Sequence, residues 1–261
     1  LEPEEAESWT AGFEYRPNWL AGASFSATYF DIDFANRISV PGDVLSAIAN
    51  PAPYGAVLIR DPDAATLASY LAILDRLGGV APADGVELIW DGRVTNLSSL
   101  RVRGIDASAT YAFETDLGRF EASLSASHLL QFDRRSNPSS PGEQLLNTIY
   151  NPIDWRVRAG LSWSAGPWRA SGFANYLGGY DDTISNPDRE IDAWTTFDAR
   201  LGISLSNAET SGSPRTELAF NISNLFDEEP PFANSSEGFA YDNRNASPLG
   251  RFVSIEVRRR W

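Results

Sequence analysis

The sequence contains no cysteine, no methionine and no lysine, and it has one histidine, His128. The lack of cysteine excludes disulfide frameworks, cysteine nucleophiles and Cys/His zinc sites. All 21 basic residues are arginine and the net charge is −14, so we expect no nucleic-acid partner. A complete gene product begins with methionine, whereas this chain begins with Leu1, so we expect a fragment or a chain trimmed at its front.

Long apolar runs are also missing, because no stretch of roughly 18 or more apolar residues occurs. This excludes a transmembrane helix and makes a soluble protein the first interpretation. Aromatic residues nevertheless make up 12% of the chain, including eight tryptophans. An outer-membrane barrel has a similar average hydropathy, since only alternate residues face lipid, so composition does not separate the two classes.

Apolar and polar residues alternate with a period of two over most of the chain, which is typical of strands with one oily and one wet face. Clear examples are Trp9, Ala11, Phe13 and Tyr15; Ile105 to Phe113; Phe120 to Ala126; Trp155 to Trp163; Phe197 to Leu205; Leu218 to Ile222; and Val253 to Val257 with Trp261. Two segments are less regular. Residues 22–34 suggest a bulge near Tyr29, and residues 167–178 place Phe173 and Leu177 on the wet face.

The pattern predicts nine strands whose connections alternate between short and long. The strands are expected at 7–16, 22–34, 99–115, 118–132, 153–165, 167–178, 193–207, 215–225 and 249–261. The short connections are 17–21, 116–117, 166 and 208–214, and the long ones are 35–98, 133–152, 179–192 and 226–248. A soluble β-sandwich has no reason to sort loops by side, whereas outer-membrane barrels have short periplasmic turns and long extracellular loops. We therefore predict an all-β, antiparallel transmembrane β-barrel.

The odd number of strands predicts that this barrel is incomplete. An odd number cannot close with antiparallel pairing throughout, and unpaired edges in lipid leave backbone groups unsatisfied. We therefore expect further strands before Leu1.

Several motifs resemble the C-terminal part of the TonB-dependent outer-membrane receptors and transporters. Residues 221–227, Asn-Ile-Ser-Asn-Leu-Phe-Asp, precede Pro230-Pro231 and later Gly250-Arg251. The start of the chain resembles a strand pair of the family, through Leu1, Pro3-Glu4, residues 9–15, Tyr29-Phe30 and Asn36-Arg37-Ile38. A third family signature is resembled by Gly104-Ile105-Asp106. The last strand resembles the assembly signal of outer-membrane barrels, carried by Phe252, Val253, Ile255, Val257 and Trp261.

The resemblance spans residues 1–261 and implies one domain, about nine strands from the C-terminal part of a 22-stranded barrel. It also implies a plug domain and a TonB-contacting segment, neither of which this sequence contains. The partners implied are the TonB complex, reached through that missing N-terminal part, the plug domain, outer-membrane lipids and the barrel assembly machinery. The location implied is the outer membrane of a Gram-negative bacterium.

The connection 35–98 contains the pattern of a helix. Asp61-Pro62 predicts its N-terminus, Gly78-Gly79 follows its end, and Leu67, Tyr70, Leu71, Leu74 and Leu77 form an apolar stripe. We expect this helix to pack over the barrel mouth or against a neighbouring loop. Leu67, Tyr70, Leu71 and Leu74 are candidates for a gate, and a purely structural loop helix is the equal alternative.

No catalytic, cofactor-binding or metal site is predicted. Asp181, Asp182, Asp188, Glu190 and Asp192 offer oxygen ligands that suit calcium, but they lack the spacing of a calcium loop, and a solvated acidic loop is the favoured interpretation. His128 is placed on the lipid side near the outer interface. No phosphate loop, nucleophile elbow or metalloprotease motif occurs.

The function predicted is TonB-dependent active uptake of a scarce nutrient, either a metal chelate such as a siderophore or an oligosaccharide. A passive porin is the alternative, and an outer-membrane barrel enzyme is less favoured because there is only one histidine.

Overall fold

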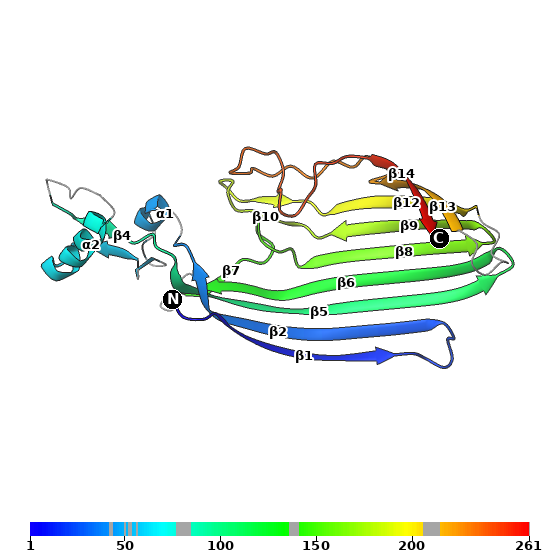
Figure 1. Ribbon diagram of the computed structural model, residues 1–261, viewed down its shortest axis with the longest axis horizontal. Helices are drawn as coiled ribbons and strands as arrows, with labels where there is room; N and C mark the ends of the chain where they lie inside the picture. The colour runs from blue at the N-terminus through cyan, green and yellow to red at the C-terminus, as the bar shows by residue number, and fades with distance from the viewer. Residues whose placement is uncertain are drawn as a thin grey trace. The chain divides into compact units, whose positions relative to one another are not determined.

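The structure, a computed structural model, describes residues 1–41, 44–49, 51, 54–55, 57–76, 85–135, 141–205 and 215–260. Within these residues one sheet contains ten strands, nine of them in the order β1-β2-β5-β6-β8-β9-β12-β13-β14, with the short β7 (Glu143–Gln144) paired to β6 beside this path (Figure 1). The bounds of those nine are Glu5–Tyr15, Ala23–Ser39, Thr95–Thr115, Gly118–Arg135, Trp155–Ala165, Trp168–Leu177, Trp194–Ser204, Arg215–Ser223 and Phe252–Arg260. These bounds agree with the nine predicted strands to within a few residues.

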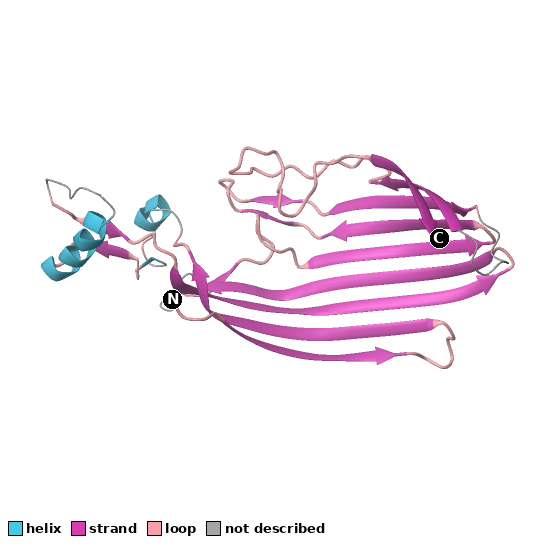
Figure 2. Ribbon diagram, viewed as in Figure 1, coloured by secondary structure: helices cyan, strands magenta, loops and turns pink. Residues whose placement is uncertain are grey.

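The pairings along the second half of this sheet are antiparallel, from β6 through β8, β9, β12 and β13 to β14. Strands dominate the molecule in Figure 2. The all-β, antiparallel class is therefore confirmed, whereas the count of 22 strands stays a prediction. Among the described residues, no helix has the length and apolar character needed to cross a bilayer.

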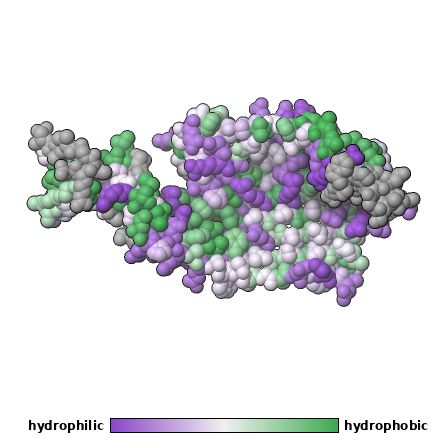
Figure 3. All heavy atoms as spheres, in the orientation of Figure 1, coloured by the Kyte–Doolittle hydropathy of each residue, from purple (hydrophilic) through white to green (hydrophobic). Residues whose placement is uncertain are grey.

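The register sorts the side chains onto two unlike faces. One, the apolar face, carries rows such as Phe120, Trp163, Ala170, Leu201, Phe220 and Ile255, joined pair by pair across the strands. Its large side chains are exposed, for example Leu161 at 50% and Ile255 at 76%. Figure 3 shows hydrophobic residues gathered on β14. In the part of the chain that the structure describes, no second protein layer covers these side chains, as expected of a sheet that faces lipid.

Aromatic side chains repeat at a fixed spacing along the apolar face. Between β6 and β8, Phe120 pairs with Trp163, and eight residues further along β6 His128 pairs with Trp155. On β9, Trp168 and Tyr176 are also eight residues apart. Eight steps of about 3.3 Å span about 26 Å along a strand, or about 20 Å of height at a tilt of about 40°. This agrees with an apolar band between two aromatic girdles.

The other face, the polar face, explains why β9 looked irregular. The ring of Phe173 lies under the guanidinium of Arg158, with 4.1 Å between the ring centroid and Cζ. Gly160 makes room for it, since a Cβ there would come within 2.7 Å of the ring. Leu177 is buried in a loop cluster described below. Both apolar residues therefore have specific partners on a wet face.

A similar pairing accounts for Phe30 on β2, because a Cβ on Gly104 would lie 2.6 Å from its ring. Inside β2, Asn36 has a φ of 52°, the left-handed conformation that accompanies bulges. The predicted bulge near Tyr29 stays a prediction.

The chain divides into two compact units. The first comprises residues 1–8, 32–101 and 133–144 and contains α1 (Val44–Ala49), β3 (Leu58–Arg60), α2 (Ala64–Arg76), β4 (Leu88–Trp90) and β7 (Glu143–Gln144). The second comprises residues 9–31, 102–132 and 145–261 and includes β10 (Tyr180–Asp182) paired with β11 (Arg189–Ile191).

Candidate functional site

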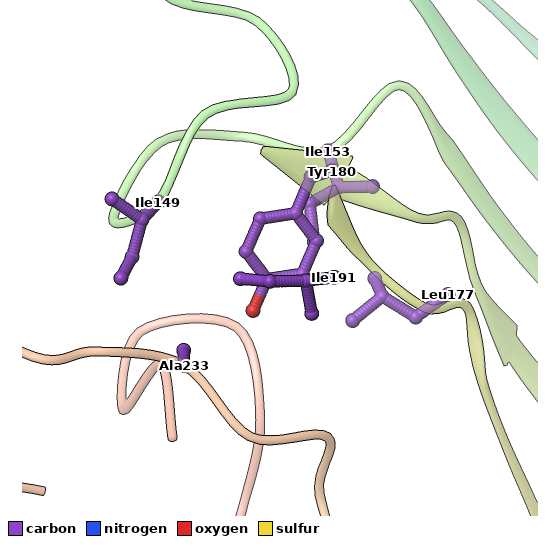
Figure 4. Close-up of a cluster of buried hydrophobic side chains, with 6 residues drawn as sticks. All are labelled: Ile149, Ile153, Leu177, Tyr180, Ile191 and Ala233. Carbon is purple, nitrogen blue, oxygen red and sulfur yellow. The ribbon is translucent and has the colours of Figure 1, made fainter. Parts of the chain in front are cut away.

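Three loops of the second unit fold together around a small apolar core. Ile149, Ile153, Leu177, Tyr180, Ile191 and Ala233 are all buried there, with Tyr150 and Trp194 packed against them (Figure 4). These residues come from the connections 145–154, 178–193 and 226–251 and from the neighbouring strand end. All three connections were predicted to be long extracellular loops. Their shared core makes them one body, called here the loop cluster.

Asp182 joins two of these loops from a fully buried position, with 0% exposure. Its carboxylate accepts bonds from the backbone N of Ile184 and Ser185, each at 3.1 Å, and from the Ser185 hydroxyl at 2.9 Å. Across the cluster it accepts the backbone N of Asn234 at 2.8 Å. Burial acts to raise the pKa of Asp182, but these bonds outweigh it, and the pKa lies below its usual value.

Asp242 plays the same part in the last long loop and is also fully buried. It accepts the backbone N of Tyr150 at 3.0 Å and of Arg244 at 3.0 Å, and the side-chain amide of Asn245 at 2.7 Å. Burial and then the charge of Asp242 raise the pKa of the Tyr180 hydroxyl. Two buried carboxylates therefore hold the loop cluster together.

The prediction that the acidic side chains of this loop are solvated is wrong for Asp182, because backbone and hydroxyl donors bind its carboxylate in place of water. Asp181, Asp188, Glu190 and Asp192 are exposed as expected. Within the described ranges, no three His, Asp or Glu side chains group in a way that could hold a metal ion.

A groove of about 350 Å³ lies on the polar side of β8, β9 and β12, beside the loop cluster. Polar and charged side chains line it together with a larger apolar surface from the strands, and one lining residue comes from the last long loop. The lining residues are Ser125, Ser127, Arg156, Val157, Arg158, Asn175, Tyr176, Leu177, Trp194, Thr196 and Asn245.

Both arginines of the groove are tied to the last long loop. Nη2 of Arg156 donates to Oδ1 of Asn245 at 2.7 Å. Nη1 of Arg158 donates to Asn175 and, at 3.3 Å, to Asp198, and Asp198 accepts the backbone N of Asn224 at 3.1 Å. The groove therefore connects the polar face to the loop cluster.

The Asn-Leu-Phe-Asp motif is the turn that starts this loop. Asn224 and Asp227 have φ values of 50° and 61°, and the side chain of Asn224 exchanges bonds of 2.8 and 2.9 Å with the backbone of Glu228. Asp227 accepts the backbone N of Arg251 at 2.6 Å, where β14 is about to begin. The motif therefore joins the two ends of the last long loop.

The predicted loop helix is present as α2, in the first unit. It begins at Ala64, and its N-cap is Asp63, which accepts the Thr66 backbone N at 2.7 Å. The prediction of Asp61 as the N-terminus is therefore wrong by two residues; Asp61 has a φ of 47° and its backbone N donates to Glu87. Leu77 and Gly78-Gly79 lie outside the described residues.

The four gate candidates Leu67, Tyr70, Leu71 and Leu74 are half-buried. The hydroxyl of Tyr70 donates to Asp91 at 2.9 Å, and Arg93 donates to the same carboxylate at 2.5 and 2.8 Å. These bonds tie α2 to the segment after β4. The gate role stays a prediction. The short helix α1 and the pair β3 and β4 were not predicted at all.

Of the predicted assembly signal, Phe252, Val253, Ile255 and Val257 are exposed on β14, and Trp261 lies outside the described residues. His128 stacks on Trp155 with ring centroids 4.1 Å apart, on the apolar face as predicted. Its Nδ1 is buried without a hydrogen-bond partner in the described part of the chain.

Residues 1–225 match the family described as "TonB dependent receptor-like, beta-barrel". The chain belongs to the TonB-dependent receptor family. Members of this family are transporters of the outer membrane of Gram-negative bacteria, not enzymes, and they work with TonB and a plug domain. No curated protein matches the sequence.

Among solved structures, the fold of this TonB-dependent receptor chain is similar to that of "Copper transporter OprC", with a TM-score of 0.52 and 14% identity over 98% of the chain. It is also similar to a variant of the ferric enterobactin receptor PfeA from Pseudomonas aeruginosa, with a TM-score of 0.57 and 16% identity over 97% of the chain. The chain spans 32% and 31% of these two proteins, about a third of their length.

Proposed function

We propose that this chain is part of a transporter for TonB-dependent uptake of a scarce nutrient across the outer membrane. The observation that carries the proposal is the two-faced sheet, with an exposed apolar face, an arginine-bearing polar face and long loops folded into one cluster. This arrangement suits a wall between lipid and an aqueous path, capped on the outside by loops. Metal chelates and oligosaccharides are the two substrate classes under test.

In this proposal, residues 1–261 form one C-terminal part of the barrel, and the whole protein works with a plug domain and the TonB complex. The family match and the shared fold support this. Outer-membrane lipids contact the apolar face. The barrel assembly machinery recognises Phe252, Val253, Ile255 and Val257 on β14 together with Trp261, the next residue after this strand in the sequence.

The test is uptake by a deletion strain of the source bacterium and by the same strain carrying the gene, under metal limitation or with oligosaccharides as the carbon source. Uptake that requires the gene and stops when an uncoupler removes the proton gradient is the expected result. Gene-dependent uptake that continues with the uncoupler would instead establish the passive porin.

The gate proposal concerns α2, with the half-buried Leu67, Tyr70, Leu71 and Leu74 as the candidate gate residues. The half-burial of these side chains and the bond from Tyr70 to Asp91 support a helix held by its own loop. Deleting residues 61–79 should change the rate or selectivity of uptake. Unchanged uptake would leave α2 a structural helix.

A further inference from the structure

The groove beside the loop cluster has a charge opposite to that of the chain. The net charge of the chain is −14, yet the residues that line this groove include Arg156 and Arg158 and no carboxylate. We infer that the groove binds an anionic group, a carboxylate or a phosphate, carried by the transported solute. The inference rests on the proposed uptake function and adds to it the charge of the substrate.

Both guanidinium groups keep donors for such a ligand. Arg156 uses Nη2 for Asn245, and Arg158 uses Nη1 for Asn175 and Asp198. Among the residues that the structure describes, no partner bonds to Nε or Nη1 of Arg156, or to Nε or Nη2 of Arg158. The free Nε and Nη2 of Arg158 lie on one edge of its guanidinium and can bind a planar carboxylate or phosphate with two parallel bonds. The free Nε and Nη1 of Arg156 lie on different edges, and each can donate one bond to an anion.

The arginines are also fixed before a ligand arrives. Phe173 supports the face of the Arg158 guanidinium at 4.1 Å, and Asn245 holds Arg156 from the loop. A side chain that is already ordered loses less conformational entropy on binding. The hydroxyl-bearing Ser125, Ser127 and Thr196 add neutral hydrogen-bonding groups along the same wall.

Of the two arginines in this groove, Arg156 has the smaller charge compensation. Its one hydrogen-bond partner in the described ranges is the neutral amide of Asn245, whereas Arg158 has the carboxylate of Asp198 at 3.3 Å. A second groove of about 260 Å³ on the same sheet, lined by Arg119, Arg169 and Arg200, contains Glu121 and no residue of the loop cluster. The first groove differs in having no carboxylate in its lining and in including a residue of the last long loop, so we place the anion site there and use the second groove as a control.

This chemistry separates the substrate classes left open above. The guanidinium groups of Arg156 and Arg158 repel a bare metal cation. A neutral oligosaccharide has no negative charge to compensate these two arginines. A solute with anionic arms, such as a metal chelate built on carboxylates, satisfies both arginines at once.

The test uses the complete protein in detergent, with citrate as the anionic probe and maltotriose as the neutral one, titrated in a calorimeter at low salt. We expect citrate to bind and Arg156→Gln and Arg158→Gln each to weaken binding by at least about tenfold, the size of one charge-assisted hydrogen bond. Arg158→Lys should give an intermediate affinity. Arg169→Gln, in the second groove, should bind citrate like the unchanged protein. Retained gel mobility of the unheated barrel shows that each variant is folded.

The inference is overturned if citrate does not bind at millimolar concentration, if both glutamine variants match Arg169→Gln, or if maltotriose binds as tightly as citrate. Binding in detergent needs neither TonB nor a proton gradient. A protein that binds citrate through Arg156 but fails in uptake would therefore contradict the proposed transport function and leave the anion site standing.

Discussion

Replacing Asp182 with alanine should release the contact between two extracellular loops without unfolding the sheet. Asp182 accepts four hydrogen bonds, three from its own turn and one from the backbone of Asn234. The side chain is fully buried, so its removal leaves these donors without an acceptor.

The expected loss of local stability is estimated from two hydrogen bonds, the one from the Asn234 backbone that crosses the loops and one bond of the Asp182 turn. Hydrogen bonds to a charged acceptor contribute about 1.5 to 3 kcal/mol each, and the four are not additive, so about 3 kcal/mol of local stability should be lost. This corresponds to roughly a hundredfold higher opening equilibrium for the Asn234 amide.

Hydrogen exchange of the Asn234 amide in the complete protein measures this opening directly. Asp188→Ala is the matched control, because Asp188 lies in the same loop with an exposed side chain. Exchange of Asn234 in Asp182→Ala at the rate seen in Asp188→Ala would refute the role of the buried carboxylate.

Four further predictions test other parts of the structure. Gly160→Ala should displace Phe173 and cost about 1 to 3 kcal/mol in denaturant unfolding, whereas Gly172→Ala, whose nearest contact would be 3.9 Å away, should be close to neutral. Leu161→Arg on the apolar face should destabilise the barrel by about 2 to 4 kcal/mol, while Ser162→Arg on the polar face should be tolerated; equal losses would contradict the assignment of the faces. Asp63→Ala should remove the N-cap of α2, seen as roughly fivefold faster exchange of the Thr66 amide. The control is Asp61→Asn, because asparagine tolerates the left-handed backbone conformation of this exposed residue. The hydrogen bonds of Asp182 hold its pKa below 3.8, so the ionised carboxylate stabilises the loop contact above about pH 4. This stabilisation is lost as the pH falls through the lowered pKa. Protection of the Asn234 amide, corrected for intrinsic exchange, should therefore be constant near pH 7 and fall below pH 4.

Most strands of the sheet were predictable because they alternate apolar and polar residues over about ten positions, and a one-residue shift would put every side chain on the wrong face. The start of α2 was misplaced because Asp61 and Asp63 are both suitable caps, and only the bond to Thr66 distinguishes them. The segment 40–60 was missed, since a helix of six residues and a strand of three carry no clear period.

The groove and the loop cluster were not predictable, because they join residues far apart in the sequence. Asp182 meets Asn234 and Arg156 meets Asn245, in each case across a loop whose path the sequence does not specify. Phe173 and Leu177 were the sequence feature that could have indicated these contacts. Each is an apolar residue on a wet face, and each has a buried or cationic partner.

The height of the apolar band has a consequence for the membrane in which this protein can reside. Just beyond His128 and Trp155, on the same face, Arg103 and Asp31 form an ion pair at 2.9 Å, which belongs in water or among headgroups. A band of about 20 Å would leave a mismatch of about 10 Å with a hydrocarbon core of about 30 Å, at a fraction of a kcal/mol for each ångström. The thinner outer membrane reduces this penalty, so a barrel with this spacing fits that membrane with less distortion than it would fit a thicker one.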